Sequence, residues 1–82
     1  MVIVFSPLCQ KDIIDYIESF EIDGGKVFYF KEKEGMRLIF DSTIEDEYEA
    51  CKVAKKVMGR FKYASGLNYY VAPYDGKEVK WI

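Results

Sequence analysis

The sequence predicts an α+β fold in which strands and helices follow the order βαββαββ. Two observations carry this prediction. Apolar runs of strand length, rich in β-branched or aromatic residues, occur at 2–5, 27–30, 36–40 and 67–73. Between them lie two longer segments whose apolar residues recur at helical spacing and whose first residues include serine or threonine, which cap helices well. The chain has 82 residues, which suffice for one domain, and we expect that domain to span 1–82.

The first strand and the first helix are the clearest elements. Val2–Phe5 is a continuous apolar run, which is typical of a strand buried on both faces. Serine is a good N-cap and proline is favoured in the first helical turn, so Ser6 and Pro7 predict a helix from about Pro7 to Phe20. The Asp-Gly-Gly run at 23–25 then indicates a turn.

A hairpin and a second helix follow. Val27–Phe30 and Met36–Phe40 read as strands joined by a polar loop, Lys31–Gly35. The second helix is expected to begin near Ser42 or Thr43 and to end at Gly59, since glycine is a common helix stop. Its start is inferred from two pairs with capping-box spacing, Ser42 with Glu45 and Thr43 with Asp46. Its buried stripe comprises Ala50, Cys51, Ala54, Val57 and Met58.

The C-terminal part predicts two more strands. Leu67–Pro73 is the first, the Asp75-Gly76 pair is a strong two-residue hairpin signal, and Val79–Ile82 is expected to pair back. The simplest arrangement of all these elements is a mostly antiparallel sheet with both helices on one face. This arrangement resembles the ferredoxin-like split βαβ fold with an extra C-terminal strand. Many unrelated functions occur on that fold, so it implies no activity.

The composition excludes several chemistries. The chain has no histidine, which removes the usual general base near neutral pH and the commonest transition-metal ligand. Cys9 and Cys51 form no paired-cysteine motif, so we expect two reduced, inert thiols. Carboxylate pairs on shared helix faces are typical of solvated helices; these pairs are Asp12–Asp15 and Glu45–Glu49. We therefore expect a protein that is not an enzyme.

Charge and hydropathy narrow the partners and the location. No apolar run approaches the roughly 20 residues of a membrane helix, and the start of the chain is too short for a secretory signal. We therefore expect a cytoplasmic protein that does not enter a membrane. The Arg60–Tyr63 segment interleaves bases with aromatic rings, as nucleic-acid-binding surfaces do. However, the net charge is −2 and no RNP1-type run is present, so nucleic acid is an unlikely partner.

The predicted chain reversals gather carboxylates at one end of the molecule. The end of the first helix, the exit of the third strand, the start of the second helix and the last hairpin all lie there. They carry Glu18, Glu21, Asp23, Asp41, Glu45, Asp46, Glu47 and Asp75. Part of this pattern is structural, because acids at a helix start stabilise the helix dipole by about 0.3–1 kcal/mol.

A functional interpretation of the same pattern is a weak calcium site. Calcium takes six to eight oxygen ligands, so converging loop carboxylates could bind it. The candidate ligands are Asp23, Asp41, Glu45 and Asp46. In size, acidity and order of elements the chain also resembles small archaeal α+β proteins described as calcium-binding and otherwise of unknown function. That resemblance implies a calcium ligand, but it rests on the outline of the whole chain and assigns no individual residue.

The alternative is a non-enzymatic protein-interaction module, which includes a homodimer. An open sheet rich in tyrosine could be covered by a partner or by a second copy. Val27 and Tyr29 are expected to share one sheet face, with Tyr69 or Tyr70 and Trp81 as neighbours.

Overall fold

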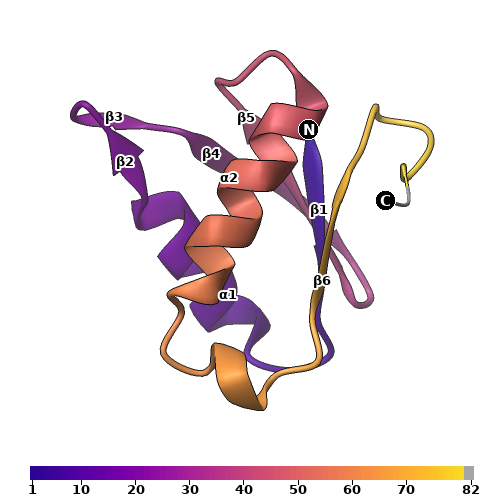
Figure 1. Ribbon diagram of the computed structural model, residues 1–82. Coiled ribbons are helices and arrows are strands. Elements are labelled where there is room, and N and C mark those ends of the chain that lie inside the picture. The colour runs from indigo at the N-terminus through magenta and orange to yellow at the C-terminus, as the bar shows by residue number, and fades with distance from the viewer. Residues whose placement is uncertain (81–82) are drawn as a thin grey trace.

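The computed structural model describes residues 1–80 (Figure 1). The main strands are β1 (Val2–Phe5), β4 (Phe28–Glu34), β5 (Arg37–Ser42) and β6 (Tyr70–Pro73), and the helices are α1 (Gln10–Ser19) and α2 (Glu47–Gly59). Three short elements complete the chain: β2 (Glu21–Ile22), β3 (Gly25–Lys26) and the 3₁₀ helix η1 (Ala64–Gly66).

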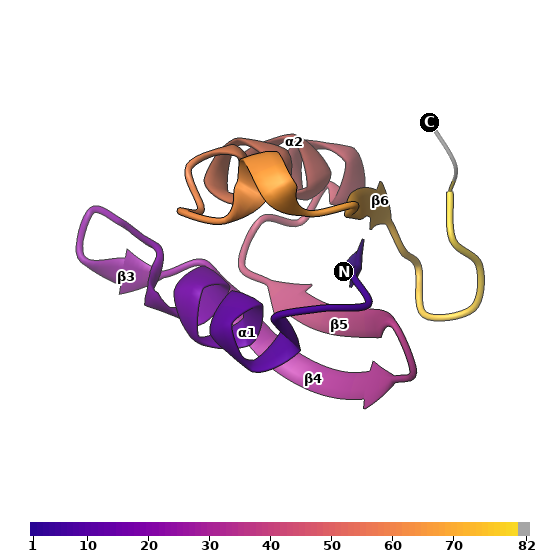
Figure 2. The same cartoon turned by 90° about the horizontal axis from the view of Figure 1, so that it is seen from below.

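The four main strands form one antiparallel sheet in the order β4-β5-β1-β6, and β2 and β3 form a separate two-stranded hairpin. Figure 2 shows α1 and α2 on the same side of the sheet. The predicted α+β class and the mostly antiparallel sheet are therefore confirmed.

The core lies between the sheet and the two helices. Val2, Val4 and Phe40 point into it from the sheet, and Ile17 and Met58 meet them from α1 and α2. Each such side chain contributes about 1.5–3 kcal/mol when it is fully buried. The opposite face of the sheet is also closed at its centre, where the paired residues Ile3, Ile39 and Ala72 are fully buried. The first strand is thus buried on both faces, as its sequence predicts.

Helix α1 begins at Gln10, three residues later than predicted. The predicted cap, Ser6, is used elsewhere: its hydroxyl donates to the Leu8 carbonyl at 2.8 Å, and its N–H donates to the Met36 carbonyl at 3.0 Å. Gln10 then ties the loop to the β4–β5 turn by donating to the carbonyls of Ser6 (2.8 Å) and Gly35 (2.9 Å). The Ser6 hydroxyl is therefore used in a local bond and its N–H in a distant one, so Ser6 does not cap α1.

Helix α2 also begins later than predicted, at Glu47, and its N-cap is Asp46. The Asp46 carboxylate accepts hydrogen bonds from the N–H groups of Tyr48 (2.8 Å) and Glu49 (3.4 Å). Neither predicted capping box forms. Ser42 is the last residue of β5, and its hydroxyl accepts from the Ile44 N–H at 3.0 Å. The Thr43 N–H donates to the Val27 carbonyl at 2.9 Å and is not available to Asp46.

Several strand boundaries differ from the prediction. Strand β4 continues to Glu34 through a bulge between Phe30 and Glu32, so the predicted loop at Lys31–Gly35 is mostly strand. An additional hairpin, β2–β3, forms around the predicted turn at 23–25, where Asp23 and Gly24 have positive φ angles of 52° and 81°.

At the C-terminal end, β6 begins at Tyr70 rather than Leu67, and η1 precedes it at residues 64–66. The predicted last strand, Val79–Ile82, is represented among residues 1–80 by one isolated bridge between Tyr74 and Val79. Its final two residues, Trp81 and Ile82, lie outside the described residues.

Candidate functional site

The carboxylates proposed as calcium ligands do not converge. The turn of the β2–β3 hairpin carries Asp23. By contrast, Asp41 lies near the end of β5, and Glu45 and Asp46 lie in the loop before α2, away from that hairpin (Figure 1). Among residues 1–80, no three cysteine, aspartate or glutamate side chains are grouped so that they could hold a metal ion. The expected carboxylate cluster is thus absent from this part of the chain, and calcium binding stays a prediction.

Several of these acids already have structural partners. We call this end of the molecule, where α2 begins and residues 74–80 turn, the acidic end. Asp46 caps α2, and the Glu47 carboxylate forms an ion pair with the Lys80 ammonium at 2.8 Å. Asp75 accepts from the N–H groups of Lys77 (2.8 Å) and Glu78 (2.7 Å).

These contacts change proton affinities at the acidic end. The hydrogen bonds from the N–H groups of Glu78 and Lys77 lower the pKa of Asp75. The hydrogen bond and charge of Glu47 raise the pKa of Lys80. Both shifts favour the charged forms, so the acidic end is held together by its own ionic contacts rather than prepared for an added cation.

The opposite end has a different character. It is formed by segment 60–70, the loop 6–9 and the turn 35–36, and we call it the 60–70 end. It exposes apolar side chains: Leu8 is 63% exposed, Met36 is 53% exposed and Tyr63 is 47% exposed. Three surface hollows of about 290–400 Å³ each border residues between 60 and 70. Large exposed apolar side chains beside hollows are typical of a binding surface.

Cations at the 60–70 end lack ionic partners. Within the described part of the chain, no carboxylate lies within 4.0 Å of the cationic groups of Lys55, Lys56, Arg60 or Lys62. The Lys62 ammonium instead lies 4.9 Å from the centre of the Tyr63 ring. By contrast, Lys80 at the acidic end contacts Glu47 at 2.8 Å. The 60–70 end therefore carries positive charge that no nearby carboxylate of residues 1–80 compensates.

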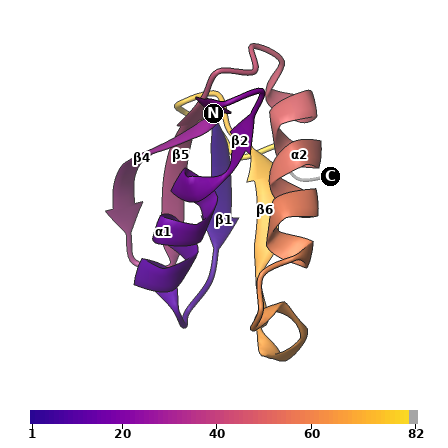
Figure 3. The ribbon, with the colours of Figure 1, turned by 90° about the vertical axis from the view of Figure 1, so that its left-hand side faces the viewer.

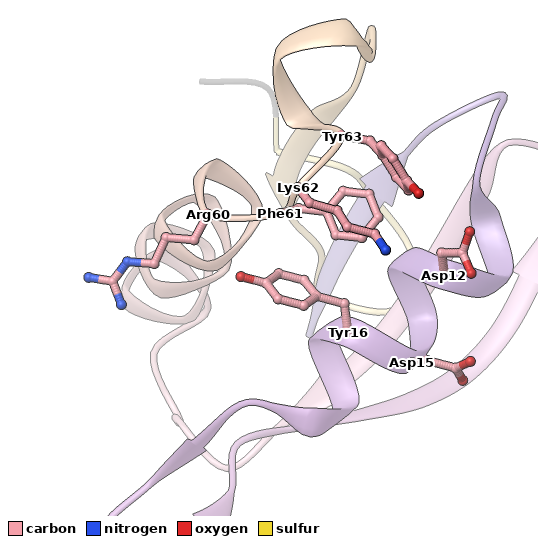
Figure 4. A pocket seen from close by; sticks show the side chains of 7 residues that line it. All are labelled: Asp12, Asp15, Tyr16, Arg60, Phe61, Lys62 and Tyr63. Carbon is pink, nitrogen blue, oxygen red and sulfur yellow. The ribbon is translucent and has the colours of Figure 1, made fainter.

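One of these hollows, of about 400 Å³, lies between α1 and residues 60–63 (Figure 4). Its lining is Asp12, Asp15, Tyr16, Arg60, Phe61, Lys62 and Tyr63. Phe61 forms the floor, since it is only 6% exposed, and its ring centre lies 5.1 Å from that of Tyr16 and 5.6 Å from that of Tyr63. We call this hollow the aromatic pocket.

On each free edge of the sheet, a helix side chain occupies one backbone group. On the β4 edge, the Phe30 N–H donates to the Glu18 carboxylate at 2.9 Å, and Lys26 lies 3.7 Å from the same oxygen. Figure 3 shows α2 running alongside β6, where the Cys51 thiol donates to the Val71 carbonyl at 3.7 Å. A partner strand therefore finds no free backbone at these two positions.

The expected tyrosine-rich sheet face does not form as predicted. Val27 is buried in the core on the helix side, whereas Tyr29 is exposed with the Lys26 ammonium 4.7 Å from its ring centre. Tyr70 packs near Phe5, at the other end of the sheet from Tyr29. The prediction that Val27 and Tyr29 share a face was wrong, because the chain turns from β3 into β4 at Val27 and no longer alternates regularly there.

The two thiols are free, and they differ in burial. Burial raises the pKa of Cys51, which keeps that thiol protonated and unreactive. Cys9 is partly buried at the left-handed position before α1, where its φ is 57°.

Sequence reasoning did not identify the 60–70 end as a surface. The signal was present in the Arg60–Tyr63 segment, but the sequence alone does not show that Leu8 and Met36 are exposed at the same end. Ser6 and Gln10 bring them there through their bonds to Met36 and Gly35.

Within residues 1–80, neither helix has the length and apolar character that crossing a membrane requires. No family model matches this chain, and neither does any curated protein or solved structure. The resemblance to small archaeal calcium-binding proteins therefore stays a prediction.

Proposed function

We propose that this protein is a non-enzymatic interaction module that docks an acidic segment of another protein, one with apolar side chains, at the 60–70 end. The observation that carries the proposal is that uncompensated cations and exposed apolar side chains occur together at this one end of the molecule. Arg60 and Lys62 supply charge for the acidic groups of the partner, and Leu8 and Met36 supply apolar contact area.

A protein segment fits this surface better than a nucleic acid does. Exposed aliphatic side chains such as Leu8 and Met36 have no counterpart in a sugar–phosphate backbone, whereas apolar side chains of a peptide can cover them.

Docking at the 60–70 end is also favoured by what is closed elsewhere. Glu18 occupies the Phe30 N–H at the β4 edge, α2 covers β6, and Ile3 and Ile39 are already buried on the sheet face away from the helices. Strand addition and stacking on the sheet are therefore poor modes for either a partner or a second copy.

Two further points belong to the proposal. The position of β1 between β5 and β6 supports a ferredoxin-like arrangement. The free thiols of Cys9 and Cys51 support a cytoplasmic location, where thiols stay reduced.

The test is an amide NMR titration with three probes. They are a synthetic glutamate-rich peptide with isolated leucines, its lysine-for-glutamate counterpart, and single-stranded oligouridine RNA. We expect the glutamate peptide to give saturable shifts at residues 6–9, 35–36 and 60–70, and we expect the affinity to fall as salt is raised.

The control variant is Lys33→Glu on the exposed β4 strand, which changes the net charge by as much as Lys62→Glu does. Lys62→Glu should weaken the glutamate peptide several-fold and Lys33→Glu should not. Saturable binding of oligouridine at the same residues with higher affinity than the peptide would contradict the proposal, as would peptide shifts confined to other surfaces.

A further inference from the structure

We propose that the aromatic pocket binds a free amino acid with an aromatic or large aliphatic side chain. This inference goes beyond the docking proposal and does not rest on it. It follows from the aromatic floor of the pocket and from two side chains of opposite charge beside it, Asp12 and Lys62, which do not form an ion pair with each other.

The apolar part of the pocket is preformed. Tyr16 and Tyr63 stand on either side of Phe61, with ring centres 5.1 Å and 5.6 Å from that of Phe61, and the Phe61–Tyr63 pair is edge-to-face at 83°. The floor residue is held in the hydrophobic core cluster. A volume of about 400 Å³ lies in the range of small-molecule sites, and an apolar side chain would lie against these rings.

The charged part supplies one group of each sign. Figure 4 shows the Lys62 ammonium on the side of the pocket toward Asp12, while Arg60 and Asp15 extend away from the centre. No ion pair within 4.0 Å joins Lys62 to Asp12, and within residues 1–80 neither has another ionic partner. The Lys62 ammonium and the Asp12 carboxylate face one pocket without forming an ion pair. They can therefore bind the carboxylate and the ammonium, respectively, of a zwitterionic ligand.

The binding mode follows from these groups. The α-ammonium of the ligand donates to the Asp12 carboxylate, and the α-carboxylate accepts from the Lys62 ammonium. The side chain of the ligand packs on Phe61 between Tyr16 and Tyr63. Each charged hydrogen bond is made only if the ligand carries that charge, so a zwitterion should bind more tightly than a ligand with one charge.

The experiment compares L-phenylalanine with phenethylamine, which lacks the carboxylate, with 3-phenylpropanoate, which lacks the ammonium, and with glycine, which lacks the side chain. Binding is followed by the amide shifts of Tyr16, Phe61 and Tyr63. We expect a dissociation constant of about 1 mM for L-phenylalanine, as its small size implies. Each analogue should bind about tenfold more weakly.

Two variants assign the contacts. With Asp12→Asn, L-phenylalanine should bind no better than 3-phenylpropanoate does, and with Lys62→Gln it should bind no better than phenethylamine does. The matched controls are Asp23→Asn in the β2–β3 turn and Lys33→Gln in β4, which should leave the affinity unchanged. Amide shifts outside the pocket report whether each variant keeps the fold.

Two results would overturn the inference. One is the absence of saturable shifts at Tyr16, Phe61 and Tyr63 with L-phenylalanine. The other is equal affinity for L-phenylalanine and either single-charge analogue, which would show that the missing charge is not recognised. Neither result bears on the glutamate peptide, so a failure here is distinguishable from a failure of the docking proposal.

Discussion

The two ends of this molecule carry charges that are used in opposite ways. At the acidic end, Asp46 caps a helix, Asp75 closes a turn and Glu47 pairs with Lys80. At the 60–70 end, Arg60 and Lys62 have no carboxylate within 4.0 Å among the described residues. The charged side chains of the acidic end are thus used in contacts within the chain, whereas Arg60 and Lys62 at the 60–70 end are available to a binding partner.

This difference shows why counting charges misleads in a chain whose net charge is only −2. The acidic residues suggest a calcium site because so many of them lie at one end of the molecule. Three of them, Asp46, Glu47 and Asp75, have structural roles through their hydrogen bonds and ion pairs. Arg60 and Lys62, by contrast, form no ion pair among the described residues.

The largest effect on stability is expected from Asp46→Ala. This substitution removes the side chain that accepts from the N–H groups of Tyr48 and Glu49, and loss of an N-cap costs about 1–2 kcal/mol. Chemical denaturation measures the loss. Lys56→Ala, at the other end of α2, should change the unfolding free energy by less than about 0.5 kcal/mol. Equal losses of unfolding free energy in the two variants would contradict the account that only the charges of the acidic end stabilise the fold.

A smaller loss, about 1 kcal/mol, is expected from Glu18→Ala, because it removes the acceptor of the Phe30 N–H. The freed backbone should also allow weak self-association through the β4 edge, which sedimentation at increasing concentration would detect. Glu21→Ala, an exposed acid with no side-chain partner among residues 1–80, is the control. A Glu18→Ala protein with unchanged stability would show that the hydrogen bond from the Phe30 N–H to Glu18 does not stabilise the β4 edge.

The pH dependence of the acidic end should be modest and of known sign. Hydrogen bonds lower the pKa of Asp75 in the folded protein, so its contribution is complete above the unfolded pKa of about 4. That contribution is lost as the pH falls through the lower, folded value. In an acid titration followed by thermal unfolding, Asp75→Asn should lose less stability below about pH 4 than the wild-type protein does. A steeper loss in the variant would contradict the assignment.

The smallest expected effect is that of calcium. Since Asp23 lies apart from Asp41, Glu45 and Asp46, and Asp46 already binds two N–H groups, we expect no saturable shifts of these residues in an amide NMR titration at millimolar calcium. Magnesium serves as the control for general screening. Saturable, calcium-specific shifts at these four residues would support the calcium hypothesis. The acidic end, rather than the 60–70 end, would then be the end that binds a ligand.

The sequence was sufficient for the parts of the fold that depend on apolar pattern. The run Val2–Phe5 and the stripe from Ala50 to Met58 are buried as predicted. It was insufficient for the helix starts. The N–H groups of Ser6 and Thr43 donate to Met36 and Val27, which are far away in the chain. The hydroxyls of Ser6 and Ser42 form local bonds with Leu8 and Ile44 instead of capping a helix. Capping signals are local, and they give way when the sheet offers a partner.

The candidate site shows the same limit more strongly. Chain reversals did place acids at one end, but the sequence does not show that Lys80 returns to Glu47 or that Glu18 reaches Phe30. Nor does it show that Leu8 and Met36 remain exposed beside segment 60–70. Which side chains are satisfied and which are free depends on tertiary contacts.

The most direct test of the docking surface is a change of partner preference in one double variant, Arg60→Glu with Lys62→Glu. The wild-type protein should bind the glutamate-rich leucine peptide and not its lysine counterpart, and the double variant should bind the lysine peptide instead, with shifts at the same residues. If the double variant keeps the wild-type preference, or if the shifts move to the acidic end, the 60–70 end is not the docking surface.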